Sequence, residues 1–292
     1  MLSILIPVYN FDCVDLVSDL HQQGQSLSIG FEIIVLEDAS TRFLAQNHSL
    51  HQLFPNIKYE RLSKNIGRAS IRNLLAQKAV YDYLLFIDCD SAVIRKDYLK
   101  RYVAQLNPKQ LLYGGRVYQE KPPKEKAFHL HWKFGRHREQ IPAKQRGLQP
   151  YQSFMTNNFV VPKAIFQPIK FDENLKQYGH EDTLFGMELK SQHIPILHLD
   201  NPLEHIGLER TDVFLEKTEK ALENLTQLHK AGKKIDTKLL RTYNKISSYK
   251  LNLPLKIALQ FLQPVLKSLL YRKKPALFIF DCYKLSVFIQ KM

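Results

Sequence analysis

The stretch DYLLFIDCDS, residues 82–91, decides how this chain is expected to fold. Its apolar run ends abruptly at an Asp-Cys-Asp sequence, as a buried strand does where it reaches the edge of a sheet. Similar apolar runs occur in LSILIPV, residues 2–8, and FEIIVLE, residues 31–37. All three runs are continuously apolar rather than alternating, which indicates a sheet that is covered on both faces.

Helical spacing separates these strands. Residues 14–23 and 68–80 have the periodicity of helices, and a weaker strand pattern covers residues 57–62. Strands that alternate with helices are typical of βαβ units. The predicted fold class is therefore α/β, with a mostly parallel, Rossmann-like sheet flanked by helices.

The second half of the chain continues with mixed patterns. Residues 119–150 are polar and basic, and we expect a long loop or a flap over the edge of the sheet. Further on, the sequence predicts a strand and helix over 158–166, a turn opening a helix over 177–190, a strand over 194–199 and a helix over 209–230.

Ligands of such sheets bind beyond the carboxyl ends of the strands. Three segments follow strands and should meet there: Pro7 to Asn10, Glu37 to Ser40, and Asp88 to Ser91. Each segment supplies polar groups. The sequence therefore predicts a ligand site along one rim of the sheet.

Two aspartates of this rim, Asp88 and Asp90, are spaced to converge on one hard cation. Mg²⁺ and Mn²⁺ prefer oxygen ligands and often combine one or two carboxylates with substrate phosphates. His205, in NPLEHIG, could complete the shell, since imidazole binds Mn²⁺. The alternatives are a solvated acidic loop and a structural histidine.

Residues between the strands offer further polar contacts. Asp38 could accept a hydrogen bond from a nucleobase or a ribose, or it could simply cap a helix. Gly67 permits a close backbone approach. Arg68 and Arg72 lie one helical turn apart and could hold a diphosphate, or could be two solvated arginines at a helix start.

The GHED segment, residues 179–182, presents two carboxylates near a helix N-terminus, where negative charge is stabilised. Transfer of a glycosyl group to a hydroxyl needs a base, and one carboxylate could serve while its neighbour holds sugar hydroxyls. An ordinary acidic first turn is the alternative.

Composition narrows the class of protein. The chain has 292 residues, a net charge of +14, 45% apolar residues and three cysteines. This apolar content is enough for a full core, and three scattered cysteines give no disulfide framework, so a reduced cytoplasmic compartment is expected. No apolar run is long enough for a transmembrane helix, and the N-terminus lacks the features of a signal peptide.

From about residue 245 the sequence becomes a basic amphipathic tail, in which nine lysines and arginines face one acid, Asp281. Such a segment can lie on an anionic membrane surface, which would make the protein peripheral on the inner face of the cytoplasmic membrane. Alternatively, its apolar residues pack against the preceding α/β domain.

Taken in order, PVYN, VLEDAS, the spacing of 65–73, IDCDS and GHED resemble family-2 glycosyltransferases of GT-A fold. The resemblance covers roughly residues 1–210. GHED followed by His205 looks like the chondroitin-polymerase and β-1,4-galactosyltransferase branch. That branch usually has Trp-Gly before the acidic pair, where this chain has Tyr178 and His180, and Glu37 stands where an aspartate is frequent.

The resemblance implies a role for each matching residue. Pro7 and Tyr9 would frame the nucleobase, and Asp38 would bond the uracil or ribose. Gly67, Arg68 and Arg72 would lie near the donor nucleotide. Asp88 would reach the ribose or the metal, Asp90 and His205 would bind Mn²⁺ (or Mg²⁺), Asp182 would be the general base, and Glu181 would hold a sugar hydroxyl.

The resulting hypothesis is an inverting glycosyltransferase that uses a nucleoside-diphosphate sugar, expected to be a UDP-sugar. The acceptor would be a glycan or lipid-linked hydroxyl in polysaccharide or glycoconjugate synthesis. Residues 1–210 would form the GT-A domain, with a nucleotide-sugar half over about 1–115 and an acceptor half over about 150–210. Residues 211–292 would form a helical, basic extension.

Two alternatives remain open. One is a basic module that binds polyanions or membranes and carries a catalytically inactive GT-A-like domain. The other is a nucleotidyltransferase, although PVYN is not the glycine-rich phosphate loop expected of one. Nucleic acid is not an expected partner, because the rim is acidic and the basic residues form no stripe with stacking aromatics.

Overall fold

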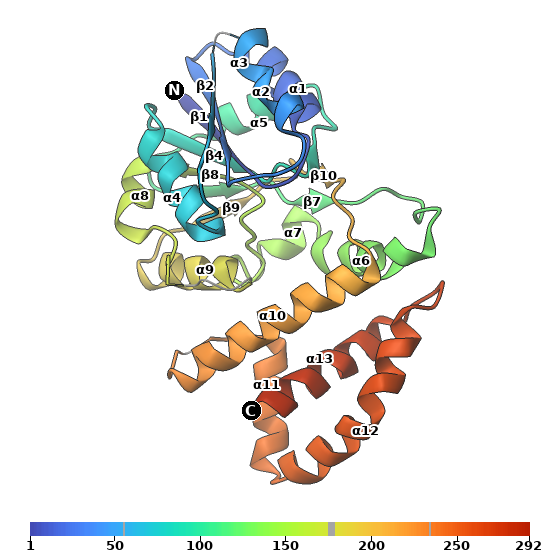
Figure 1. The fold of residues 1–292 in the computed structure, drawn as a ribbon. Coiled ribbons are helices and arrows are strands. Elements are labelled where there is room, and N and C mark those ends of the chain that lie inside the picture. Colours follow the sequence, from blue (N-terminus) through green and yellow to red (C-terminus); the bar gives the residue numbers. More distant parts are fainter. Residues whose placement is uncertain (55, 175–178, 234) are drawn as a thin grey trace. The chain divides into compact units, whose positions relative to one another are not determined.

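The computed structural model describes residues 1–292 except 55, 175–178 and 234, and it divides into two compact units (Figure 1). Unit 1 comprises Met1–Gln119, Glu139–Lys176 and Glu181–Gly207. Unit 2 comprises Glu120–Arg138, Gln177–His180 and Leu208–Met292.

Unit 1 is built on a seven-stranded sheet. In spatial order its strands are β3 (Ile57–Arg61), β2 (Phe31–Glu37), β1 (Leu2–Val8), β4 (Tyr83–Ile87), β8 (Asn158–Pro162), β6 (Leu111–Tyr113) and β9 (Ile196–His198). The first four strands are parallel, β8 is antiparallel to both of its neighbours, and β9 is parallel to β6. The mostly parallel α/β sheet predicted from the apolar runs is confirmed.

Helices cover both faces of this sheet. The helices of unit 1 are α1 (Val14–Gly24), α2 (Leu44–His48), α3 (Leu50–Leu53), α4 (Arg68–Lys78), α5 (Tyr98–Val103), α7 (Ala143–Arg146), α8 (Lys163–Ile169) and α9 (Glu181–Ser191). On β1, Ile4 belongs to one buried cluster with Leu20 of α1, and Leu5 belongs to the other with Leu75 of α4. Alternate residues of one strand therefore enter two cores, which explains why the strand is continuously apolar.

A second, small sheet shapes the rim. It joins β5 (Ser91–Ala92), β10 (Leu203–His205) and β7 (Arg116–Val117), with β10 in the middle. His205 pairs with Ser91, so β10 is placed directly beside the residues that follow β4. The strands of this small sheet are too short for a period to be recognised, and none of them was predicted.

Unit 2 is helical. It contains η1 (Lys126–Phe128), α6 (His129–Phe134), the first residues of η2 (Gly135–Glu139), α10 (Thr211–Lys230), α11 (Lys238–Ser248), α12 (Asn252–Leu270) and α13 (Leu277–Lys291). Phe134, Phe214 and Phe280 pack together, with ring centroids 5.5 Å apart in each pair. Among the described residues, no helix has both the length and the apolar character that crossing a membrane requires.

Of the two expectations for residues 119–150, the long loop is wrong, and the flap over the rim stays a prediction. This segment forms short helices, and its first part, Glu120–Arg138, belongs to unit 2. Leu130 is fully buried and Phe134 packs on Phe214 and Phe280. Their four-residue spacing was present in the sequence, but the many lysines and arginines around it concealed the helical pattern.

Candidate active site

Asp38, which follows β2, is anchored by backbone groups. Its two carboxylate oxygens accept hydrogen bonds from the amides of Ile66 and Gly67, at 2.7 and 3.0 Å. Gly67 has φ +85°, a left-handed conformation that glycine adopts without strain. The aspartate thus holds the loop that opens α4. Each oxygen keeps a second lone pair for a ligand, so the nucleotide contact remains a prediction.

Asp88, at the carboxyl end of β4, is held between two arginines. Its Oδ1 lies 2.6 Å from Arg72 Nη2, and its Oδ2 lies 3.4 Å from Arg116 Nη2. Arg72 is 3% exposed and lies over the Phe171 ring. Arg72 is therefore a buried partner that fixes the Asp88 carboxylate. It is not a solvated arginine at the start of α4. Its expected contact with diphosphate remains untested.

Asp90 and His205 come together although 115 positions separate them. His205 Nδ1 lies 3.5 Å from Asp90 Oδ1, and the Ile206 amide donates to the Asp90 carbonyl at 2.9 Å. Gly207 closes the space, since a Cβ there would stand 2.6 Å from Asp90 Cβ. The small sheet thus brings two of the three expected metal ligands into one pair.

The charge state of Asp90 is set by opposing effects. Burial favours the neutral acid, but His205, Arg116 and Arg68 outweigh it and hold the pKa of Asp90 well below its ordinary value. Asp90 Oδ1 is buried and accepts no hydrogen bond from any residue that the structure describes. An ionised, buried carboxylate oxygen beside an imidazole is the donor set that Mn²⁺ accepts.

These residues fit a divalent cation that is held jointly with a ligand. Within the described ranges, no three His, Cys, Asp or Glu side chains gather as a metal site. Asp88 is engaged by Arg72 and Arg116 instead of completing a cage with Asp90 and His205. Cations of this kind commonly take remaining ligands from water and substrate phosphates.

Asp182, the second residue of α9, is connected to the same rim through the two residues that precede β8. Thr156 donates its hydroxyl to Asp182 Oδ1 at 2.5 Å, and the carbonyl of the next residue, Asn157, accepts from the Asp88 amide at 3.0 Å. Burial and the neighbouring Glu181 raise the pKa of Asp182, against the smaller lowering effects of Thr156 and Arg72. A carboxylate with a raised pKa is a better proton acceptor.

The end of β1 supplies the exposed aromatic group expected there. Pro7 is half-buried in the strand, while Tyr9 is 56% exposed just beyond it. Asn10 follows with φ +53°, and its Oδ1 accepts from the amides of Thr41 and Arg42. These bonds tie the loop after β1 to the loop after β2.

Glu37, at the end of β2, lies in the interior of unit 1. It is fully buried, and its Oε1 accepts from Asn47 at 2.6 Å. The departure from the family pattern at this position is therefore a packing feature. The sequence also departs from the family branch at Tyr178 and His180, ahead of the acidic pair. His180 has φ +72°, and Tyr178 lies outside the described residues.

Sequence reasoning missed three residues of the rim: Arg116, Glu139 and Thr156. Arg116 lies 3.4 Å from both Asp88 and Glu139, and Glu139 also accepts from Tyr118. The Gly114–Gly115 pair was the available signal, since a Cβ at Gly114 would meet Tyr102, Asn158 and the Asn201 carbonyl within 2.6 Å. Such close approach marks a constrained backbone.

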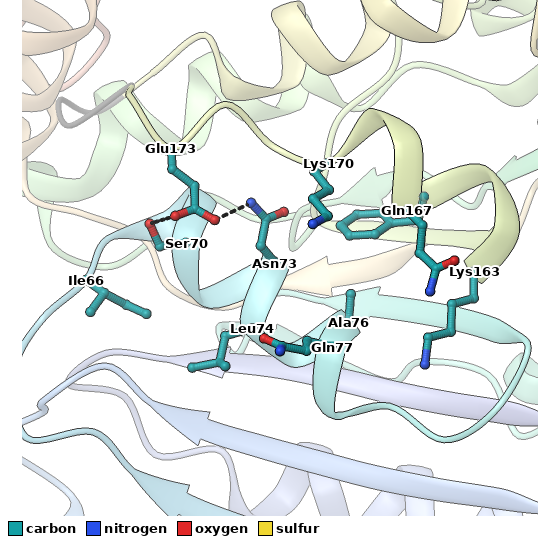
Figure 2. A pocket seen from close by; sticks show the side chains of 11 residues that line it. Ile66, Ser70, Asn73, Leu74, Ala76, Gln77, Lys163, Gln167, Lys170 and Glu173 are labelled. Atoms are coloured by element: carbon teal, nitrogen blue, oxygen red, sulfur yellow. Dashed lines mark hydrogen bonds between the residues drawn. The ribbon is translucent and has the colours of Figure 1, made fainter.

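A separate pocket of about 550 Å³ lies between α4 and α8 (Figure 2). Ser70, Asn73 and Gln77 of α4 line it, and Glu173 accepts from Ser70 and Asn73. Its lining includes none of the predicted site residues. Arg72 lies on the face of α4 that contacts the rim, and the residues that line the pocket lie on another face of the same helix.

A family model described as Glycosyl transferase family 2 matches residues 3–166, more than half of the chain. An uncharacterized glycosyltransferase from Haemophilus influenzae is 32% identical over 97 residues, which cover 32% of this chain and 37% of the relative. The match thus spans little more than a third of that protein's length.

Solved structures share the fold. Mannosyltransferase PcManGT from Pyrobaculum calidifontis, in complex with GDP-Man and Mn²⁺, matches with a TM-score of 0.54 and 9% identity, covering 78% of this chain and 64% of that one. S. aureus TarS 1-349, in complex with UDP-GlcNAc, matches with a TM-score of 0.53 and 17% identity, covering 99% of this chain and 88% of that one. At such identities the likeness establishes the GT-A fold alone.

Proposed function

This chain belongs to glycosyl transferase family 2, and from that premise we propose that it transfers a sugar, with inversion, from a UDP-sugar to a hydroxyl of a glycan or lipid-linked acceptor. UDP is preferred as the nucleotide because the TarS match, whose structure contains UDP-GlcNAc, extends over 99% of the chain. We further propose a role in polysaccharide or glycoconjugate synthesis. GHED and His205 support the chondroitin-polymerase and β-1,4-galactosyltransferase branch.

One observation carries this proposal: Asp88, Asp90, His205 and Asp182 lie along a single rim. Asp88 and Asp182 are connected through consecutive residues of one segment, Thr156 and Asn157. Asp90 follows Asp88 by two positions and faces His205. A carboxylate base, a candidate cation site and several arginines therefore surround one stretch of strand ends, where a diphosphate donor would bind.

In this proposal Asp90 and His205 would hold Mn²⁺ or Mg²⁺, which when bound would neutralise charge on the departing diphosphate. Asp182 accepts the proton of the acceptor hydroxyl. The acceptor oxygen then bonds to the anomeric carbon while the bond from that carbon to the diphosphate oxygen breaks. Arg68 and Arg116 lie near enough to lower the pKa of Asp90, so they are placed to offset diphosphate charge too.

The other residues of the rim position the donor. Tyr9 would offer its exposed ring to the nucleobase, and Asp38 would offer its remaining lone pairs to the uracil or ribose. Glu181, which is 8% exposed, would hold a sugar hydroxyl next to the general base Asp182. Asp88, fixed by Arg72 and Arg116, would present a carboxylate oxygen to the ribose or the cation.

The test is a screen of UDP- and GDP-sugars with Mn²⁺ that measures released nucleoside diphosphate, with and without glycan acceptors. We expect one UDP-sugar to be consumed, and we expect Asp182→Asn to bind UDP normally while turnover falls by roughly 1,000-fold. No release from any donor would favour the inactive, polyanion-binding alternative. Pyrophosphate release from a nucleoside triphosphate would favour a nucleotidyltransferase.

A further inference from the structure

Helix α12 packs against the rest of unit 2 along one of its sides. It forms a hairpin with α13 (Figure 1), in which Gln290 near the end of α13 donates to the Lys256 carbonyl at 2.9 Å. Leu259 and Leu270 are buried on the packed side. The contact with α13 therefore buries a single stripe of side chains on the 19-residue helix.

The other side of α12 is apolar and exposed. Leu253, Ile257, Phe261 and Val265 recur four residues apart and therefore share one face. Phe261 is 76% exposed and Leu253 is 67% exposed. We call these four residues the α12 face. Soluble surfaces rarely expose a continuous row of large apolar side chains, so such a row marks a contact site.

Basic and aromatic residues surround the α12 face. Arg272, Lys273 and Lys274 follow the helix, are exposed, and have no carboxylate within ion-pair distance among the described residues. Tyr249 precedes the helix, and Phe278 follows at 74% exposure. Aromatic rings and basic groups beside an apolar helical face are typical of segments that lie in a membrane interface.

The charge of the whole chain agrees with this surface. Of the 42 basic and 28 acidic residues, unit 1 holds 19 of each, so the entire net charge of +14 belongs to unit 2. After residue 244 the sole acid is Asp281, which is paired with Arg138 and Lys284. The unit that exposes the apolar face is therefore also the unit that anionic surfaces attract.

We propose that the α12 face is a docking site for an anionic lipid surface, with its apolar side chains inserted below the headgroups and Arg272, Lys273 and Lys274 at the phosphates. A second copy of the chain fits less well, because two such faces would bring like charges together. A soluble polyanion would use the lysines and arginines but not the exposed phenylalanine and leucines. The inference does not depend on the proposed function.

The experiment compares sedimentation of the full chain with phosphatidylcholine vesicles and with vesicles that also contain phosphatidylglycerol. We expect binding to the anionic vesicles alone. The variant Leu253→Ser/Phe261→Ser/Val265→Ser should lose it, while Leu53→Ser/Val80→Ser/Leu148→Ser, three exposed apolar residues of unit 1, should bind as the wild type does. Circular dichroism confirms that each variant is folded.

A charge variant gives a second, independent measure. Each basic residue near an anionic surface contributes about 1 kcal/mol, so Arg272→Gln/Lys273→Gln/Lys274→Gln should weaken partitioning roughly 100-fold. Its matched control, Lys96→Gln/Lys109→Gln/Lys144→Gln, changes three exposed lysines of unit 1 and should have little effect.

Three outcomes would overturn the proposal. The wild type could fail to bind anionic vesicles, or the serine variant of the α12 face could bind them as well as its control. The wild type could also form a dimer that the serine variant abolishes, which would assign the face to a second copy. Donor turnover, measured in solution on the same variants, reports separately on the proposed function.

Discussion

Asp88 and Asp90 are two positions apart, yet their surroundings give them different tasks. Both oxygens of Asp88 face arginines, so its charge is already neutralised and its orientation fixed. Asp90 retains a buried oxygen that accepts no hydrogen bond within the described parts of the chain. A cation that binds there would therefore displace no proton from Asp90, because the carboxylate is already ionised.

The variant Asp90→Asn removes the charge that would attract the cation and keeps the side-chain shape. We expect metal-dependent donor turnover to fall by at least roughly 100-fold, since even indirect changes at metal sites cost 10- to 100-fold. Mn²⁺ titration of released nucleotide measures this. Asp97→Asn, at a half-exposed acid that directly precedes α5, is the matched control. If Asp90→Asn kept the wild-type Mn²⁺ response, Asp90 would not be a ligand.

Gly207 offers a way to move Asp90 without altering its chemistry. A methyl group at Gly207 would stand 2.6 Å from Asp90 Cβ, so Gly207→Ala must displace that side chain. We expect the Mn²⁺ concentration for half-maximal turnover to rise by about tenfold or more. Gly147→Ala is the control, because its nearest atoms are 3.5 Å away. Equal Mn²⁺ responses in both variants would contradict the placement of the cation.

Thr156 tests the role of Asp182 as base through pH. Burial and Glu181 raise the pKa of Asp182, and the Thr156 hydroxyl partly opposes them. A base must be ionised, so kcat should fall as pH drops through this pKa. Thr156→Val removes a lowering effect and should move that fall to higher pH.

The matched control for this variant is Thr218→Val, whose hydroxyl bonds only a backbone carbonyl of α10. It should leave the pH profile unchanged. A Thr156→Val profile identical to the wild type would show that another group accepts the proton.

At the scale of elements, the long apolar strands could be predicted, and so could β9 within the apolar run over residues 194–199, but β6 and the strands of the small sheet could not. A run such as residues 82–88 predicts β4 because burial on both faces removes polar residues from it. β7 and β10 have two and three residues, and their pairing depends on long-range contacts rather than on any local period. Hence the meeting of His205 with Asp90 was predicted from the chemistry of metal ligands and from the family resemblance, not from strand patterns, and Arg116 was missed.

Asn158 of β8 shows what holds these short strands. Its Oδ1 accepts from the hydroxyls of Tyr98 and Tyr102 at 2.6 and 2.7 Å, and its Nδ2 donates to the carbonyls of Gly115 and Asn201 at 2.9 and 3.0 Å. One fully buried amide thus joins α5, β8 and the segments that lead into β7 and β10.

The variant Asn158→Ala breaks four hydrogen bonds of buried groups. Two of these groups keep another bond, because the Tyr102 hydroxyl still donates to the carbonyl of residue 158 and the Gly115 carbonyl still accepts from the Leu203 amide. Because each unsatisfied buried group costs about 1–3 kcal/mol, we expect a loss of at least about 2 kcal/mol in the free energy of unfolding. Urea denaturation followed by circular dichroism measures it. Asn107→Ala, at an exposed loop position, should cost less than about 0.5 kcal/mol. A small effect for Asn158→Ala would mean that water replaces the amide.

For the whole molecule, charge separates into a neutral unit with the candidate active site and a unit with the entire excess of +14. The composition alone indicated a polyanion or membrane partner, but it could not assign that partner to a unit. The assignment requires knowing that residues 120–138, with their six lysines and arginines, join the C-terminal helices.

This separation predicts that salt acts on the two activities differently. Raising ionic strength from about 0.1 M to about 1 M shortens the screening length from roughly 10 Å to roughly 3 Å, so exposed charges lose most of their attraction for a surface. Binding to anionic vesicles should weaken at least roughly tenfold, while an apolar contribution from the α12 face remains. Donor turnover with a soluble acceptor should change much less, because the charges of unit 1 balance and the Arg72–Asp88 pair is largely shielded from solvent. Sedimentation and nucleotide release, measured across the same salt series, give both responses, and a parallel loss of the two would mean that the basic unit takes part in donor turnover.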